Sequence, residues 1–170
     1  MHFAPFEKYP ERLMHGICKR KIAMKTAIQD TPLSPWETIA EYQRAAFAGR
    51  SDFGATATFV GTMRDFNEGD GVRSMTLEHY PGMTESALET IAGEAAGRWE
   101  LMDVLIVHRV GPLHPGDPIV VVAVWSAHRK AAFEACRWLM EELKSRVPLW
   151  KREILADDTT RWVEKNTAGY

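Results

Sequence analysis

The sequence is poor in cysteine and has no long apolar run. Its two cysteines, Cys18 and Cys136, exclude a disulfide-rich framework and a zinc site built from four cysteines. The longest strictly apolar run, residues 119–125, is far shorter than the roughly 20 residues that span a bilayer. The N-terminal region has no apolar stretch of about 7–15 residues, so a secretory signal is not expected. These absences favour a reducing, cytoplasmic compartment.

An excess of positive charge is also missing. The 170 residues include 21 Lys and Arg against 23 Asp and Glu, a net charge of −2, which argues against nucleic acid as a partner. The charges are nevertheless uneven along the chain. Residues 85–117 hold six acidic and two basic residues, whereas residues 124–152 hold seven basic and three acidic residues. This pattern fits either two solvated faces or a basic pocket for a small anion in the last third of the chain.

Hydrophobic periodicity predicts a mixed order of strands and helices. Strands are expected at 25–29, 54–62, 73–80, 103–110 and 119–125, with short closing strands at 150–155 and 161–164. Helices are expected from residue 34 to about 49, over 83–98 and over 127–146, with loops at 65–71 and 111–117. This order predicts an α+β fold, with one layer of helices on a largely antiparallel sheet. Residues 1–24 have no clear periodicity and are expected to form an extension outside a single domain, 25–170.

Three predicted elements carry specific local signals. Ser34 is a candidate N-cap with Pro35 at the first helical position and Glu37 completing a capping box, and Trp36 is expected on the apolar face. The second helix is expected to turn Met83 inward with its other apolar residues. The unbroken apolar run at 119–125 predicts a strand buried on both faces.

Candidate anion ligands lie where the last long strand passes into the last helix. Ser126 is a candidate N-cap there, and the helix start offers unpaired backbone N–H groups and the positive end of the helix dipole. His128 and Arg129 add side-chain donors, a combination that suits phosphate. The alternative is that His128 satisfies a local carbonyl and Arg129 is simply solvated.

Two lysines flank the end of the same helix. Lys144 lies in its last turn, and Lys151 follows beyond Pro148. Both have ordinary explanations: Lys144 as a partner of the helix dipole, and Lys151 as a surface strand residue. If both ammonium groups shared a partly dry pocket, each would disfavour the charge of the other, which would give a lysine able to act as acid, base or nucleophile.

The remaining candidates are weaker. Arg64 follows a strand end, where an arginine can reach an anion or be solvated. Met140 lies one turn before Lys144 and is either core or pocket wall. His79, His108 and His114 lack metal-ligand spacing, and the alternation of the strand makes His108 a half-buried structural residue. The glycines match no nucleotide-binding pattern. No metal or cofactor is expected.

Taken together, these segments resemble the MoaE family, the large catalytic subunit of molybdopterin synthase. The resemblance covers about residues 25–165. It is carried by TFVGTMRDFNEGDGV (58–72), LEHYPGMTE (77–85), HRVGPLHPGD (108–117), SAHRKAAFEACRWLMEELKSRVPLWKRE (126–153) and RWVE (161–164).

The resemblance implies an α/β hammerhead-type fold and a homodimer that binds a small ubiquitin-like sulfur carrier at each end. The carrier's C-terminal Gly-Gly thiocarboxylate would supply two sulfurs to cyclic pyranopterin monophosphate, forming the dithiolene of molybdopterin. Lys144 and Lys151 would be the catalytic lysines, with Lys144 assisting attack of sulfur and Lys151 holding the thiocarboxylate or developing charge. The implied substrate-binding residues are Arg64, His128, Arg129, Arg152, Met140 and Phe59.

The helical spacing adds a prediction about assembly. His128 and Lys144 are 16 positions apart, or about 24 Å along a helix, which is too far for one small pterin. We therefore expect pockets shared between two protomers, related by a two-fold axis. A non-catalytic adaptor for a ubiquitin-like tail and a small RNA-binding module are the alternative functions. The first predicts carrier binding without pterin binding, and the net charge weakens the second.

Overall fold

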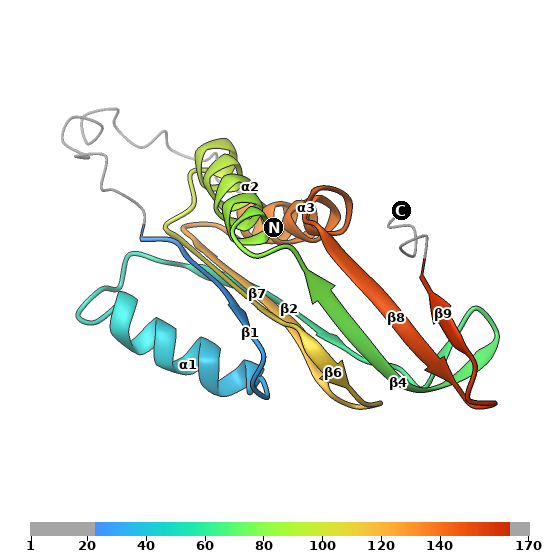
Figure 1. Cartoon of the computed structure of the whole chain (residues 1–170). Coiled ribbons are helices and arrows are strands. Elements are labelled where there is room, and N and C mark those ends of the chain that lie inside the picture. The colour runs from blue at the N-terminus through green and yellow to red at the C-terminus, as the bar shows by residue number, and fades with distance from the viewer. Residues whose placement is uncertain (1–22, 164–170) are drawn as a thin grey trace, which may run out of the picture.

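The computed structural model describes residues 23–163. The expected extension, residues 1–24, therefore lies outside the described residues except for its last two. Within the described range the predicted α+β class is confirmed, because three helices pack on two sheets (Figure 1). No helix in this part of the chain is long and apolar enough to cross a membrane.

The first sheet has four strands in the order β1-β5-β7-β2. They are β1 (Lys25–Gln29), β5 (Asp103–Arg109), β7 (Pro118–Ser126) and β2 (Ala55–Thr62). The central pair β5–β7 and the pair β7–β2 are antiparallel, and β1 joins β5 in parallel. The apolar strands β5 and β7 occupy the centre of this sheet, as their composition predicts.

The second sheet is antiparallel and is built around β4 (Asp70–His79). Strand β8 (Leu149–Leu155) pairs with β4 and carries β9 (Thr160–Trp162) on its other edge, while β6 (Gly111–Leu113) also pairs with β4. Strand β3 (Phe66–Asn67) forms a hairpin with the start of β4. The expected loop at 65–71 is therefore largely a hairpin, whose two turn residues, Glu68 and Gly69, both have positive φ.

Helices cover both faces of the first sheet (Figure 1). Helices α2 (Met83–Trp99) and α3 (Arg129–Arg146) pack on the face that includes Val122 and Val124 of β7. Helix α1 (Pro35–Ala46) packs on the opposite face, which includes Val121 and Trp125. The strand buried on both faces is thus confirmed, but the expected single layer of helices is wrong. Alternate side chains of β7 need an apolar cover on each side, and α1 supplies the second one.

Local expectations about the first two helices fail in part. Helix α1 starts at Pro35 after Ser34, as predicted, but the Ser34 side chain makes no capping hydrogen bond. Trp36 is 69% exposed and Met83 is 59% exposed, so neither faces the core. At α2 the Glu85 carboxylate accepts a hydrogen bond from the backbone N–H of Gly82 at 2.7 Å, and this cap acts from one side only, because glycine has no side chain.

A third apolar cluster joins the two sheets. Its buried members include Leu77 and Met75 of β4 and Leu113 of β6, and Ile119 of the first sheet packs against them. Beside this junction the C-terminal end of α3 turns through Pro148 into β8, so that the last helix and the second sheet meet over the ends of β5 and β7. The fold therefore brings segments from five parts of the sequence to one place.

Candidate functional site

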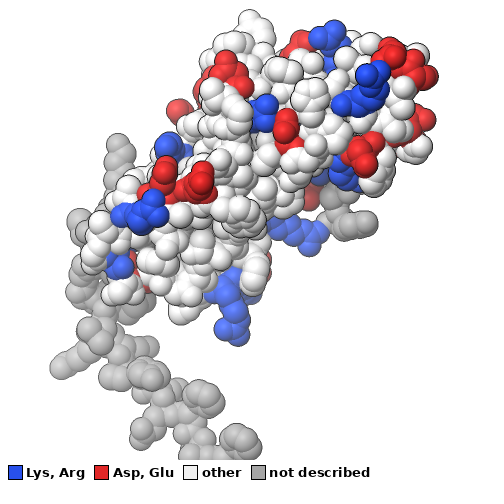
Figure 2. Space-filling view, turned by 90° about the horizontal axis from the view of Figure 1, so that it is seen from below, with Lys and Arg blue, Asp and Glu red and all other residues white. Residues whose placement is uncertain are grey.

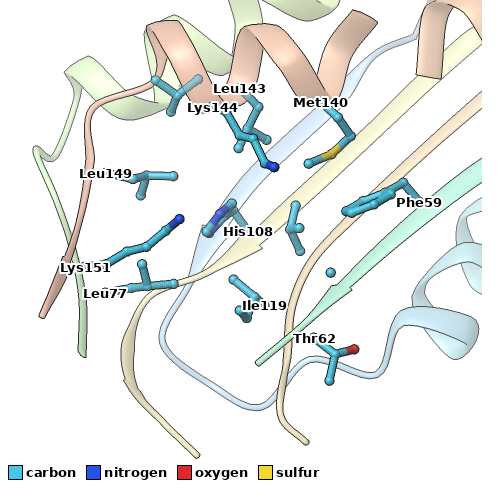
Figure 3. Close-up of a pocket in the computed structure, with 13 residues that line it drawn as sticks. Phe59, Thr62, Leu77, His108, Ile119, Met140, Leu143, Lys144, Leu149 and Lys151 are labelled. Carbon is cyan, nitrogen blue, oxygen red and sulfur yellow. The ribbon is translucent and has the colours of Figure 1, made fainter. Parts of the chain in front are cut away.

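A cavity of about 150 Å³ lies at this junction, and we call it the lysine cavity (Figure 3). Most of its lining is apolar and comes from β2, β4, β7 and the end of α3. The polar side chains among its lining residues are Thr62, His108, Lys144 and Lys151. No carboxylate is part of this lining. The described part of the chain therefore forms a largely apolar hollow that carries two basic groups.

Lys144 and Lys151 reach the lysine cavity from different elements. Lys144 extends from the last turn of α3 and Lys151 from the middle of β8 (Figure 3). Strand alternation decides the direction of the second side chain. Lys151 is partly buried and Glu153 fully buried on one face of β8, whereas Arg152 between them is exposed. The expected meeting of the two lysines in one partly dry pocket is therefore what the fold produces.

The environment of Lys151 lowers the pKa of its amine. Burial lowers the pKa of Lys151, and the nearby Lys144 ammonium lowers it further, while Glu153 acts in the opposite direction. Both lowering effects disfavour the charged form of an amine. Lys151 thus loses its proton more readily than a solvent-exposed lysine does, and an anion bound beside it would favour its charged form again.

His108 forms part of the cavity wall. Its side chain is 4% exposed, so the expected half-buried residue is in fact buried. Nδ1 lies 2.8 Å from the carbonyl oxygen of Arg109, which can only accept, so Nδ1 carries the proton. The pKa of His108 is lowered to about 4, first by burial and then by the neighbouring Lys151 and His79, against the raising effect of that hydrogen bond.

Strand alternation in the sequence indicates which way His108 points, but it does not predict that His108 lines a cavity. Strand alternation correctly placed His108 on the face of β5 that carries Val104 and Ile106. Those two residues lie in the main core, and the same face continues into the lysine cavity at His108. Only the position of β8 and α3 over this end of β5 turns a core-facing histidine into a cavity residue.

Three further residues shape the cavity. Met140 and Phe59, both expected at the site, line it, the first nearly buried and the second 40% exposed. Gly61 leaves space between them and β7. A Cβ atom at this position would lie 2.8 Å from the Val120 side chain, closer than real contacts allow. A glycine in β2 is therefore part of what keeps the cavity open.

The expected phosphate ligands at the start of α3 lie away from the lysine cavity. His128 and Arg129 are exposed and are not among its lining residues. Helix α3 runs unbroken from Arg129 to Arg146, with His128 rather than the expected Ser126 as N-cap. The Ser126 hydroxyl instead donates to the carbonyl of His128 at 2.7 Å. The two ends of α3 therefore cannot address one small ligand within a single chain.

Arg64 and Arg152 also lie outside the lysine cavity of their own chain. The guanidinium of Arg64 lies over the Phe66 ring, 4.9 Å from its centroid. Arg152 lies 5.8 Å from the centroid of the Trp162 ring and 3.9 Å from the Glu78 carboxylate. Both arginines are exposed. They remain available to a ligand or chain that approaches from outside.

The uneven charge along the sequence is balanced in part by ion pairs in three dimensions. Arg146 of α3 binds Glu94 of α2 at 2.6 Å and Glu142 at 2.9 Å, and Lys130 lies 3.8 Å from Glu134. Figure 2 shows basic and acidic side chains interspersed over the face seen there. Pairing between charged side chains therefore accounts for part of the pattern. Lys144 and Lys151 are the basic residues of this segment that line the cavity.

Metal ligation finds no support in the described residues. Residues 23–163 contain no group of three or more His, Cys, Asp or Glu side chains arranged to hold a metal ion. The chemistry that the lysine cavity offers is that of two amines, an imidazole and a hydroxyl in an apolar setting. Such a site suits an anionic ligand and proton transfer.

Comparison with known proteins identifies a single family. The family model described as MoaE protein matches residues 28–146. A curated relative from Ralstonia nicotianae, named molybdopterin synthase catalytic subunit, is 56% identical over 117 residues, which cover 69% of this chain and 66% of the relative. A relative of the same name from Pseudomonas aeruginosa is 48% identical over 141 residues, covering 83% of this chain and 91% of the relative.

Solved structures agree with this match. A molybdopterin synthase structure from Staphylococcus aureus aligns with a TM-score of 0.71 at 32% identity, covering 81% of this chain and 96% of that one. A complex of subunits 1 and 2 of the molybdopterin-converting factor from Helicobacter pylori aligns with a TM-score of 0.68 at 20% identity, covering 84% of this chain and 92% of that one. The second match shows the shared fold.

Proposed function

The chain belongs to the MoaE family, and we propose that it is the catalytic subunit of a molybdopterin synthase. In this function it is a sulfurtransferase that acts in molybdenum cofactor biosynthesis. It inserts two sulfurs from a thiocarboxylated carrier into cyclic pyranopterin monophosphate, forming the dithiolene. The observation that carries the proposal is the pair Lys144 and Lys151, which two separate elements bring into one largely apolar cavity.

The two lysines divide the work in this proposal. Lys144 assists the attack of sulfur on the substrate carbon, as acid or base or as a transient covalent partner. Lys151 holds the thiocarboxylate or the negative charge that develops during the reaction. An apolar surrounding strengthens both interactions, because charges attract more strongly where water is excluded.

The substrate needs more room than the lysine cavity offers, because the volume of that cavity, about 150 Å³, is below the roughly 300–1,000 Å³ of typical small-molecule sites. We propose that a second copy of the chain completes the site, with its His128 and Arg129 facing the lysine cavity. A two-fold axis then produces two equivalent sites from one pair of chains. The exposed positions of Arg64 and Arg152 suit the same shared site.

A small sulfur-carrier subunit is the protein partner in this proposal. The name catalytic subunit, shared by the curated relatives, indicates an enzyme with more than one kind of subunit. We propose that the carrier resembles ubiquitin and inserts its C-terminal Gly-Gly thiocarboxylate toward Lys144 and Lys151. Two carriers on one homodimer give a heterotetramer, which acts in the cytoplasm.

The direct test is reconstitution. The full chain is incubated with a thiocarboxylated carrier and cyclic pyranopterin monophosphate, and the dithiolene product is followed over time. Dithiolene formation that depends on both the chain and the thiocarboxylate supports the proposal. Carrier binding without pterin binding or product would replace it with the adaptor function. Salt-sensitive RNA binding in place of either would favour a nucleic-acid module instead.

A further inference from the structure

The lysine cavity contains a hydrogen-bond acceptor among its positive charges. His108 has one ring nitrogen, Nδ1, tied to the backbone carbonyl of Arg109 at 2.8 Å. The other nitrogen, Nε2, has no hydrogen-bond partner among residues 23–163. The buried side-chain nitrogens without a partner in this range are His79 Nδ1 and Arg109 Nε, so His108 Nε2 is not sealed in the core. It opens onto the cavity that the side chain lines (Figure 3).

The tautomer follows from the backbone contact. Because a carbonyl oxygen cannot donate, the proton of the neutral ring resides on Nδ1, and Nε2 carries a lone pair. Protonation of Nε2 would add a third positive charge, besides those of Lys144 and Lys151, to a largely apolar cavity. Burial and the charges of Lys151 and His79 all oppose this, and they hold the pKa of His108 well below neutrality. Of the charged groups near this wall, Glu153 is the one of opposite sign, and it is engaged by Arg161 at 2.8 Å.

We propose that His108 is a ligand-binding residue, whose Nε2 accepts a hydrogen bond from an N–H or O–H group that lies beside the anionic group of the ligand. This inference rests on the proposed function, since it assigns a further contact within the same cavity. The lysines attract any anion of suitable size. His108 adds a requirement for a donor, which distinguishes such a ligand from a simple anion.

The apolar surroundings give this contact its selectivity. Leu77, Leu149 and Ile119 line the same cavity and offer no polar side-chain atom that could replace Nε2. A ligand that lacks a donor would remove water from Nε2 without replacing its hydrogen bond, and an unpaired polar group in such a place is costly. The cavity therefore discriminates against anions that carry only acceptors.

Two components of the proposed reaction present the required chemistry. A pterin has N–H donors on its ring system together with a phosphate in the same molecule. A peptide C-terminus has its last amide N–H next to the carboxylate. The experiment therefore needs both, with inorganic sulfate as an anion that is fully deprotonated at neutral pH and carries only acceptors.

Two substitutions distinguish the roles of the two ring nitrogens of His108. In His108→Asn the amide nitrogen occupies the region of Nδ1 and can still donate to Arg109, but nothing replaces Nε2. In His108→Gln the longer side chain places its amide oxygen near the position of Nε2. The full-length wild type and both variants are titrated by calorimetry with cyclic pyranopterin monophosphate, with a synthetic peptide that ends in Gly-Gly, and with inorganic sulfate.

We expect His108→Asn to lose about tenfold in affinity, which corresponds to one buried hydrogen bond, for the pterin or for the peptide. The ligand that loses affinity is the one that contacts His108. His108→Gln should stay within about threefold of the wild type for that ligand, and the sulfate affinity should not change in either variant. Equal affinities of wild type and His108→Asn for both ligands would overturn the inference, as would equal losses for pterin, peptide and sulfate.

A second measurement is independent of the proposed function. The ¹⁵N shift of His108 Nε2 in the full-length chain should be that of an unprotonated nitrogen throughout pH 5 to 8. A protonated Nε2 in this range contradicts the inference, whatever the enzyme does. If the wild type instead neither binds the pterin nor forms dithiolene while Nε2 is unprotonated, the proposed function is wrong, and only the peptide titration then decides what His108 binds.

Discussion

Lys151 lies in one cavity with Lys144, and its pKa is lowered first by burial and second by the Lys144 charge. The two residues are separated by the end of α3, by Pro148 and by the start of β8. Their meeting is therefore a product of the helix-to-strand turn rather than of a local motif. The electrostatic coupling between them leads to the first prediction.

Replacing Lys144 with Gln should raise the pKa of Lys151. The substitution removes a neighbouring positive charge and keeps a polar side chain of similar length, so the charged form of Lys151 becomes easier to maintain. A ¹⁵N NMR titration of the lysine side chains measures the shift. The exposed Lys130, which pairs with Glu134, supplies the control, because Lys130→Gln should leave Lys151 unchanged. A lowered or constant Lys151 pKa in the Lys144 variant would mean that the two amines do not interact.

Lys144→Ala should reduce dithiolene formation by about 10²–10⁴-fold, the range expected for the loss of a proton-transferring residue. The fold and the carrier affinity should be preserved, because Lys144 is partly exposed and lies near the end of α3. Single-turnover assays together with carrier binding measure both effects. Lys130→Ala, on the same helix, should keep wild-type turnover. A Lys144→Ala enzyme with a near-wild-type single-turnover rate would refute the assigned role.

Mixing His128→Ala protein with Lys144→Ala protein should restore part of the activity that each lacks alone. In the proposed shared site, a mixed dimer contains one site that carries both substitutions, one from each chain, and its second site is fully wild type. Random exchange makes half of the dimers mixed, so about a quarter of all sites should regain function. The measurement is turnover after subunit exchange, with exchange verified by differently tagged chains. No recovery despite proven exchange would place both residues in the site of one chain or in no common site.

The stability of the protein should fall as the pH drops from about 6.5 toward 4, in part because of His108. A histidine in an unfolded chain titrates near 6.5, whereas burial lowers the pKa of His108 to about 4. Between these values the unfolded chain binds a proton that the folded chain does not, so protonation favours unfolding. The full contribution is on the order of 3 kcal/mol, present above pH 6.5 and lost by about pH 4.

Urea unfolding of wild type and His108→Asn at pH 7 and pH 4.5 isolates this contribution. Other groups, including Asp103, whose pKa is raised by burial, titrate in both proteins and cancel in the comparison. The variant should lose less stability than the wild type over this interval. An identical loss would show that His108 is protonated in the folded chain or does not differ between the two states.

Gly61→Ala should narrow the lysine cavity and destabilise the fold. Its new Cβ atom would lie 2.8 Å from the Val120 side chain, and such overpacking costs about 1–3 kcal/mol. Gly97→Ala is the matched control, because a Cβ atom there meets nothing within 4 Å and lies in α2. That control should be neutral or stabilising by up to about 1 kcal/mol. Thermal unfolding and turnover measure the two effects, and a neutral Gly61→Ala would mean that β2 and β7 can separate freely.

The periodicity of the sequence predicted most elements because burial in this protein follows simple alternation. Strand β7 is buried on both faces and has an unbroken apolar run, and β2 alternates threonine with apolar residues. The helix over 127–146 ends where Pro148 requires it to end. Such patterns report how much of each element is buried, but not which neighbour buries it. The second helix layer, supplied by α1, was missed for this reason.

Individual side chains were less predictable than elements. Trp36 lies at an apolar position of α1 by periodicity yet is 69% exposed, whereas Leu33 and Phe47, which flank this helix, are buried in the core. The Ser34 side chain makes no capping hydrogen bond, although the sequence signal for a cap is strong. The turn at 65–71 was expected from its glycines, but the pairing of Phe66 with Gly71 depends on the hairpin geometry.

The candidate site was predicted in part from composition and mainly from the family resemblance. The lysines, Phe59 and Met140 lie together, whereas His128, Arg129, Arg64 and Arg152 lie outside the lysine cavity of the chain. Helical spacing already indicated the separation of His128 from Lys144. No property of the sequence alone reveals that β8 pairs with β4, and it is this pairing that turns His108 into a cavity residue.

Strand β8 pairs with β4 so that Lys151 lies opposite Leu77. This register joins positions that are far apart along the chain, and closing so long a loop is slow and entropically costly. A nascent chain emerging from the ribosome can form the first sheet and most of α3 before β8 is synthesised. The second amine thus arrives after nearly all of the surrounding scaffold, and catalytic competence is acquired late during biosynthesis.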